Sequence, residues 1–502
     1  MANRQVLNII ANFSGVGARL VFALAFNIVY FRLLGDEGYG LIGFYTSLAG
    51  LSQLLDFGLN QTTLREVARR GDDGKRAGEL RSVVFTLQLL LGGIGLLVGL
   101  LVALAAPWIA TSWLSATQLA AREVTWSVTL MGGVLALLFP TNFFYGTLIG
   151  LERQVLSNAL SVAASVGRGA LIVAALLALG SAPGIFFATQ IIASLVEVAV
   201  VGLVVWRQLP PSPQRPGFDA PLIRKTWKFT SGTWLAVMFA QVATLGDKII
   251  LSTLLPLHVF GIYSLAVTVT TTIQRLAAPF TNTYFPHFVR LTEQDRRDAL
   301  LGAYRQAGEF ASAIFLSAGL LLTAYAAPIA ALLSNEAADA AGLRWLIALL
   351  ALANTLNVEM ALPFSLLFAH GITWVALRIN LALCVLYPAA LVLLVPRYGV
   401  AAAAALWLAA NALMLPALIV MTHRLILVGQ ARPWLARTIL MPSFGVTIAL
   451  AAGLSIMPGL SRVPTLIWIC LNGVLAFAAA LLCAPETRKM TLARLSRRGS
   501  TA

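Results

Sequence analysis

The chain is predicted to be an all-α integral membrane protein with about 14 transmembrane helices, and three observations predict this class. Its residues are 59% hydrophobic and only 11% charged, far from the averages of soluble domains. Its apolar stretches are roughly 20 residues or longer, which is the length that a helix needs to cross a bilayer. Its basic residues gather in alternate gaps between these stretches. Because the stretches are continuous and do not alternate with polar residues, helices are predicted in place of barrel strands.

The predicted spans follow one another with short gaps, and none of the gaps is long enough to fold as a separate domain. The first seven are Leu7–Phe31, Gly40–Leu64, Ser82–Ala105, Val124–Leu148, Asn158–Leu179, Gly184–Trp206 and Phe229–Leu254. The last seven are Phe260–Phe285, Gln306–Leu333, Leu343–Phe368, Thr373–Val395, Val400–Thr422, Thr438–Met457 and Val463–Cys483.

The distribution of charge predicts the orientation of these spans. With the N-terminus inside, the inner segments carry 26 Lys and Arg residues and the outer segments carry 5. Because cytoplasmic loops are enriched in basic residues, both termini are expected on the cytoplasmic side of a bacterial inner membrane. This distribution accounts for the net charge of +15, so a nucleic-acid partner is not needed to explain it. The basic tail, Glu486–Arg498, is expected to lie against anionic membrane lipids.

The sequence lacks the residue patterns that several functional classes require. The cysteines fall within spans and predict neither a disulfide framework nor a metal site, and the histidines, near span ends, have no ligand spacing and are expected to be interfacial. These residues are Cys384, Cys470, Cys483, His258, His287, His370 and His423. The segment Gly71–Arg76 lacks the spacing of a phosphate-binding loop, so neither a nucleotide nor another cofactor is expected. The first apolar run is too long for a cleavable signal peptide.

A linker and a weak repeat divide the chain. Residues 207–228 are rich in proline and follow the first six spans. Across this linker, Gly40-Leu41 is matched by Gly261-Ile262 at an offset of 221, in the same outer turn of each half. We therefore expect a six-helix bundle over residues 1–206, a cytoplasmic linker over 207–228 and a second bundle over 229–430. Two additional helices over 431–485 and a tail over 486–502 lie outside the repeat. Because both halves begin inside, a pseudo-two-fold axis along the membrane normal is expected.

Charged residues inside the spans are the candidate functional residues. The cations are Arg19, Arg168, Lys248 and Arg275, and the carboxylates are Asp56, Glu197, Asp247 and Glu359. Four cations facing lipid would cost on the order of 10–14 kcal/mol even on the lenient insertion scale. They must therefore face a cavity or pair with carboxylates, and structural pairing of any one of them remains an alternative. We expect the cations to bind an anionic substrate and the carboxylates to serve ion coupling.

Short motifs near the N-terminus and at the start of the second half carry a family resemblance. They are the segment from Arg32 to Gly40 (RLLGDEGYG), Leu55-Asp56-Phe57-Gly58-Leu59, Arg65-Glu66, and Asp247 followed by Gly261-Ile262-Tyr263. With them the chain resembles the polysaccharide-transporter family of Wzx-type flippases for lipid-linked oligosaccharides. That family belongs to the superfamily of multidrug-and-toxin extruders and the lipid II flippase. Twelve spans are common in the family, whereas this chain is predicted to have 14.

The resemblance implies a cargo of undecaprenyl pyrophosphate carrying a sugar oligomer, moved to the periplasmic leaflet by alternating access. The surface polysaccharide would be O-antigen, capsule or exopolysaccharide, and the polymerase machinery would be a further partner. The cations fit this chemistry, since arginine suits phosphate geometry. Tyr145, Trp234 and Tyr284 could stack on sugars, although packing or an interfacial position is the more common role of such residues.

Three alternatives stay open. An ion-coupled drug or cation extruder would share the fold, but four intramembrane cations weigh against a cationic substrate. A lipid II flippase would share the span count. A glycan polymerase would be an enzyme with a large outer loop, which the sequence lacks. Prolines inside the spans, Pro140, Pro279, Pro363, Pro388 and Pro416, are expected to kink their helices, and Pro279 is the candidate hinge.

Overall fold

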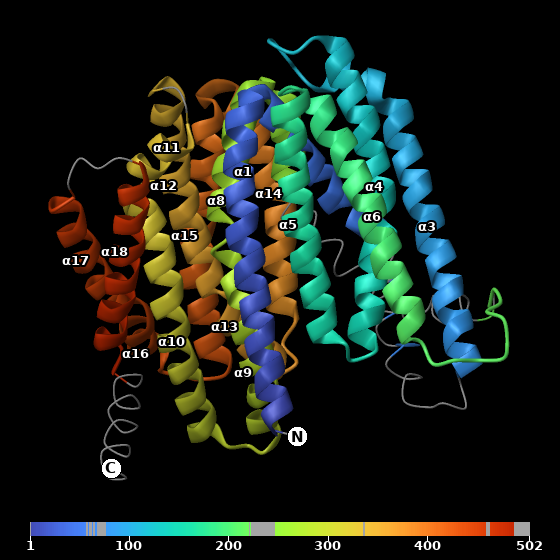
Figure 1. Ribbon diagram of the computed structural model, residues 1–502. Helices are drawn as coiled ribbons and strands as arrows, with labels where there is room; N and C mark the ends of the chain where they lie inside the picture. Colours follow the sequence, from blue (N-terminus) through green and yellow to red (C-terminus); the bar gives the residue numbers. More distant parts are fainter. Residues whose placement is uncertain are drawn as a thin grey trace. The chain divides into compact units, whose positions relative to one another are not determined.

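A computed structural model describes residues 2–56, 59, 63, 66–67, 77–219, 221, 246–334, 337–457 and 462–485 (Figure 1). The regular elements of these ranges are helices, and 11 of them are long and apolar enough to cross a membrane. They correspond to predicted spans three to six and eight to fourteen, so the all-α membrane fold is confirmed. Predicted span seven lies mostly outside the described residues.

The chain divides into a first unit, Met1–Leu265, and a second unit, Ala266–Ala502. The first unit contains residues 246–254, which are helical, and the following named elements. They are α1 (Ala2–Ser52), the 3-10 turn η1 (Gln53–Asp56), α3 (Ala77–Trp108), the π-helical turn η3 (Ile109–Trp113), α4 (Ala121–Gly150), α5 (Gln154–Leu179), α6 (Pro183–Gln208) and most of α8 (Leu257–Thr270). The predicted bundle borders differ from this division and stay a prediction.

The second unit begins within α8 and holds the remaining helices. They are η4 (Gln274–Leu276), α9 (Ala277–Glu293), α10 (Arg297–Ala324), α11 (Ala326–Leu333), α12 (Ala337–Glu359), α13 (Ala361–Ala369), α14 (Trp374–Tyr398), α15 (Val400–Leu425), α16 (Ala431–Leu435), η5 (Ala436–Leu440), α17 (Met441–Ser455) and α18 (Arg462–Cys483). The two additional helices, α17 and α18, pack against each other and against α10.

In the first unit, α4 lies between α3 and α6 and packs against both (Figure 1). Its large side chains, such as Phe139 and Phe143, join a buried apolar cluster with residues of α3 and α6. Small residues allow the closest approach, because a Cβ atom at Gly99 or Gly132 would collide with the carbonyl oxygen of the other. Close packing through small residues is the usual way in which membrane helices associate.

The first predicted span and the first part of the second, up to Ser52, lie in α1, which bends at Gly35. This glycine has a φ of 72°, a left-handed conformation that favours glycine. The bend brings the first repeat segment onto α8. A Cβ atom at Gly40 would meet the carbonyl of Leu257, and one at Gly261 would meet the carbonyl of Asp36. The two glycines that reveal the sequence repeat therefore lie at one backbone contact.

Three predicted spans of the second unit are broken. The first break lies between α8 and α9, the second between α10 and α11, and the third between α12 and α13. In each case a proline, Pro279, Pro328 or Pro363, is the third residue of the helix that follows. A proline lacks the N–H that would bond the carbonyl four residues earlier, and its ring clashes with that carbonyl. The helix therefore ends before the proline and begins again.

Candidate functional site

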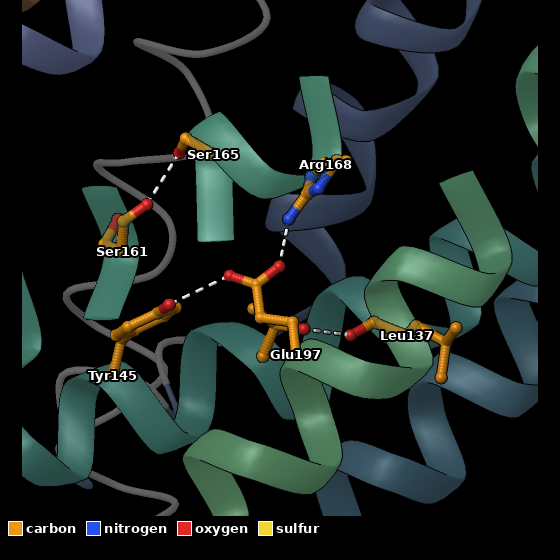
Figure 2. Close-up of polar contacts among 7 residues, drawn as sticks. Leu137, Tyr145, Ser161, Ser165, Arg168 and Glu197 are labelled. Carbon is orange, nitrogen blue, oxygen red and sulfur yellow. Dashed lines mark hydrogen bonds and ion pairs between the residues drawn. The ribbon is translucent and has the colours of Figure 1, made fainter. Parts of the chain in front are cut away.

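An ion pair within the first unit joins two of the predicted charges. Arg168 of α5 donates from Nη2 to Oε2 of Glu197 on α6. The Tyr145 hydroxyl of α4 donates to the other oxygen, Oε1, at 2.9 Å. Figure 2 shows the Glu197 carboxylate between these two side chains. Both carboxylate oxygens therefore have partners, as a buried charge requires.

The packing of α4, α5 and α6 places the three side chains together. Tyr145 lies near the C-terminal end of α4, and α4 packs against α6, which carries Glu197. Glu197 has a side chain only 6% exposed, whereas the side chain of Arg168 is 30% exposed. The carboxylate is thus enclosed, and the guanidinium keeps an open side. Removing either partner would leave an uncompensated charge, which costs several kcal/mol in a buried pair.

Arg168 has hydrogen-bonding capacity beyond this pair. A guanidinium carries five N–H donors in a planar fork. Its Nε lies buried and has no hydrogen-bond partner in the described structure. Tyr30 and Tyr45, from the two halves of α1, lie near enough to interact electrostatically with Arg168. The site is therefore an arginine held by one carboxylate and bordered by tyrosines, with part of its side chain exposed.

The structure describes the side chains of only some of the other predicted cations and carboxylates. Arg19 lies on α1, but its side chain is outside the described residues, as is that of Asp56 in η1. Lys248 is half-buried in the helix over residues 246–254. Arg275 is exposed in η4, within the break that precedes α9. Asp247, beside Lys248, accepts a hydrogen bond from Tyr263 at 3.0 Å.

Glu359 lies at the break between α12 and α13. It is the last residue of α12 and only 4% exposed. The Ser312 hydroxyl of α10 donates to Oε2 at 2.5 Å, and Oε1 is buried without a partner in the described structure. Glu309, one turn before Ser312, is also fully buried. Broken helices inside membrane proteins commonly border ion and substrate sites.

A chain of amide side chains joins the same break to its neighbours. Gln274 of η4 donates to Asn354 at 3.0 Å and to Asn357 at 3.3 Å, both on α12. Asn357 donates in turn to Asn411 of α15 at 2.8 Å. Trp407 donates to Asn354 at 3.0 Å. Such a network supplies neutral donors and acceptors, so it suits sugar hydroxyls or structural cross-linking better than it suits an anion.

A buried carboxylate outside the predicted spans, Glu37, was not among the residues that the sequence singled out as functional. Glu37, just after the bend of α1, is 2% exposed and accepts hydrogen bonds from Thr117, Gln118 and Leu119, the loop that precedes α4. Burial alone would raise the pKa of Glu37, but the hydrogen bonds from these three residues outweigh it and lower the pKa below its ordinary value. The signal in the sequence was the acidic pair Asp36-Glu37 between the first two predicted spans.

Some predicted positions are corrected by the structure. His423 is 1% exposed and lies against the rings of Tyr304 and Trp434, so it is a core residue and not an interfacial one. Tyr145 holds Glu197, which gives it a role other than the packing or sugar stacking considered above. Tyr284 is half-buried against Phe288, and Trp234 lies outside the described residues. Within the described part of the chain, His, Cys, Asp and Glu form no group that could hold a metal ion.

Comparison with known proteins agrees with this architecture. A family described as "Polysaccharide biosynthesis protein" matches residues 6–292. No curated protein matches the chain at the level of sequence. The chain is similar to the structure of the lipid II flippase MurJ in an inward closed conformation, with a TM-score of 0.71 at 12% identity, over 97% of this chain and 100% of that one.

Two further solved structures share the fold. An inward-facing multidrug-resistance MATE transporter of the MOP superfamily has a TM-score of 0.64 at 14% identity, over 83% of this chain and 98% of that one. A MOP-superfamily transporter from Pyrococcus furiosus, described as having a binding pocket of reverse polarity, has a TM-score of 0.56 at 14% identity, over 85% and 96%. At these identities the similarity shows the fold of a multi-pass membrane transporter.

Proposed function

Because the chain belongs to the polysaccharide biosynthesis protein family, we propose that it is a flippase for undecaprenyl-pyrophosphate-linked oligosaccharides. It would move these units from the cytoplasmic to the periplasmic leaflet of the inner membrane by alternating access. The glycan would serve O-antigen, capsule or exopolysaccharide synthesis, with the polymerase machinery as the next partner. Both termini would be cytoplasmic, as the distribution of basic residues indicates.

The observation that carries this proposal is the partly exposed Arg168 inside the first unit. A cationic group at that depth is expensive unless it has a function or a partner. Arg168 has one partner, Glu197, and retains an open side and an unused Nε. A guanidinium can bind a pyrophosphate in a bidentate way, because two phosphate oxygens can accept two parallel N–H bonds from its planar fork.

In the proposed mechanism, Arg168 exchanges between Glu197 and the headgroup. When the pyrophosphate binds, its oxygens take the guanidinium donors, and Glu197 loses its cation. The displaced carboxylate keeps the hydrogen bond from Tyr145 and becomes able to accept a proton or another cation. Anion binding and ion coupling would thus meet in one network. Arg19, Lys248 and Arg275 would contribute further positive charge, while Asp56, Asp247 and Glu359 would be alternative coupling sites.

The membrane potential supplies a driving force without any coupled ion. A pyrophosphate carries roughly two negative charges, and each charge contributes about 2.3 kcal/mol per 100 mV. With the inside negative, outward passage of the headgroup is favoured by about 4–5 kcal/mol at 100 mV. Coupling through Glu197 would then reset the carrier and need not supply the main driving force.

The direct test is a flipping assay in proteoliposomes with a defined undecaprenyl-pyrophosphate-linked oligosaccharide. We expect transport by the wild type, loss in Arg168→Gln and partial recovery in Arg168→Lys, which keeps the charge but not the planar fork. Arg344→Gln is the matched control, because Arg344 is exposed and stacks on Trp345. Normal transport by both Arg168→Gln and Arg19→Gln would refute the role of these cations in headgroup binding.

The same assay separates the alternatives. Lipid II, offered in place of the oligosaccharide lipid, tests whether the chain shares the cargo named for MurJ. A cationic dye tests the extruder alternative, since the MATE neighbours are described as multidrug-resistance transporters. Transport of the dye, with no flipping of either lipid, would contradict the proposed function.

A further inference from the structure

The first unit carries an open groove on a face separate from the Arg168 site. Its floor is α4, at Pro140 and Phe144, and its walls are α3 and α6. Its volume is about 570 Å³, within the range of about 300–1,000 Å³ that is usual for ligand pockets. Its lining is mainly apolar and includes Gly92 of α3 and Gly202 of α6.

The groove has a polar end. Trp206, in the last turn of α6, lines this end and donates from Nε1 to Gln88 of α3 at 3.1 Å. The guanidinium of Arg81 lies over the Trp206 ring, 5.6 Å from its centroid. Arg81 precedes Gln88 by seven residues on α3, which is about 10 Å along the helix on the same face. A cation thus stands at one end of an apolar groove.

The positive charge of Arg81 is not neutralised by a carboxylate of the described chain. One nitrogen, Nη1, donates to the carbonyl of Pro210 at 3.1 Å, and no carboxylate of the described chain pairs with it. The carboxylate of Glu79 is only two residues away, but positions two apart on a helix lie on opposite faces. Arg207, next to Trp206, is exposed and adds positive charge at the same end.

Neither Arg168 nor Glu197 lines the groove. Glu197 of α6 pairs with Arg168 of α5, whereas Trp206, nine residues later on the opposite face of α6, donates to Gln88 of α3. A ligand in the groove is therefore a different molecule from one at Arg168. The rim faces lipid, because Leu96 of α3 is 69% exposed and Leu203 of α6 is 55% exposed.

We propose that this groove binds an anionic glycerophospholipid, with one acyl chain between α3 and α6 and its phosphate at Arg81. The apolar lining suits an acyl chain, and the glycines Gly92 and Gly202 leave room for it. The cation of Arg81 beside Trp206 suits an anionic headgroup at the membrane interface. Phosphatidylcholine also has a phosphate, but its choline cation offsets that charge, so a lipid without net charge should bind more weakly beside Arg81 and Arg207. The proposal holds whatever cargo the Arg168 site carries.

The experiment is native mass spectrometry of the detergent-solubilised protein with added phosphatidylglycerol or phosphatidylcholine. The wild type should retain phosphatidylglycerol in preference to phosphatidylcholine. Gly92→Leu should abolish this retention, because a Cβ at Gly92 meets no atom within 4 Å and a leucine would extend into the groove without disturbing the fold. Arg81→Gln should weaken it roughly fivefold, the effect of one cation at a membrane surface.

The control is Ala452→Leu, which adds a leucine at a lipid-exposed position of α17 and should bind as the wild type does. Unchanged thermal unfolding confirms that each variant is folded. Retention of phosphatidylglycerol by Gly92→Leu, or equal retention of the two lipids by the wild type, would overturn the proposal. So would displacement of the lipid by undecaprenyl phosphate, or a dimer that Gly92→Leu dissociates, since the occupant would then be a polyprenyl chain or a second copy.

Discussion

Replacing Glu37 by Gln should release the loop at residues 117–119, which precedes α4. Its carboxylate accepts two hydrogen bonds from Thr117, at 2.6 Å each, and one each from Gln118 at 2.9 Å and Leu119 at 2.8 Å. A glutamine has the same shape, but it keeps one accepting oxygen and turns an NH₂ group toward two donors. The substitution therefore removes about two of the four bonds.

The magnitude follows from the charge of the acceptor. A hydrogen bond to a charged group contributes about 1.5–3 kcal/mol. Two such bonds, with partial compensation by water, suggest a local loss of about 3 kcal/mol. Because every 1.4 kcal/mol is tenfold, the amides of Thr117, Gln118 and Leu119 should exchange roughly a hundredfold faster. Hydrogen–deuterium exchange of the peptide that contains this loop measures the effect directly.

The pH dependence has a defined sign. The folded-state pKa of Glu37 lies below its ordinary value of 4.5, so the stabilisation is fully present above that value. It is lost as the pH falls through the lower, folded-state pKa. The difference between wild type and Glu37→Gln should accordingly stay constant from neutral pH to about pH 5 and shrink only in stronger acid.

The matched control is Glu293→Gln, at the exposed end of α9. It should leave exchange in the loop unchanged. Equal exchange of the loop amides in wild type and Glu37→Gln at neutral pH would refute the argument, because the carboxylate would then contribute no more than an amide. An unchanged difference in strong acid would refute the pKa argument alone.

Three further predictions test the fold and its motions. Gly261→Ala should lower the free energy of unfolding by about 1–3 kcal/mol in a denaturation assay, because its Cβ would collide with a backbone carbonyl, whereas Gly302→Ala, in open space, should not. Pro279→Ala should change the transport rate and leave headgroup affinity nearly intact, because alanine restores the N–H that could continue the helix across the break. An unaltered rate would exclude a rate-controlling hinge at this position. A reporter active only in the periplasm should be silent in the Pro210–Pro216 linker and active within Ser115–Ala121, and the reverse pattern would contradict the predicted topology.

The sequence predicted the membrane helices well because apolar length alone decides whether a segment can cross a bilayer. It did not predict that the spans containing Pro279, Pro328 and Pro363 would be broken. A proline inside a membrane helix can leave either a kink or a gap. The outcome depends on whether neighbouring helices satisfy the freed backbone groups. In the second unit Gln274, Asn354 and their partners come from three different elements, and no local pattern reveals that they meet.

The charged residues show the same limit. The cost of isolated charges in a membrane predicted that Arg168 must have a partner or a cavity. It could not identify Glu197, because the two residues are 29 positions apart on different helices. Their meeting depends on how far each helix is rotated about its own axis. The charge of the pair was therefore predictable, and its geometry was not.

The two units differ in their polar chemistry, although the sequence repeat predicts that they share a helical scaffold. In the described structure the first unit holds an ion pair with an open guanidinium, at Arg168 and Glu197. The second unit instead holds neutral amides and the buried carboxylate of Glu359. A duplicated helical scaffold can diverge in this way, because packing depends on small residues at crossings whereas binding depends on single side chains. Anionic headgroup recognition should therefore fail in Arg168→Gln, whereas loss of Asn354 should affect the glycan or the fold and leave headgroup affinity unchanged.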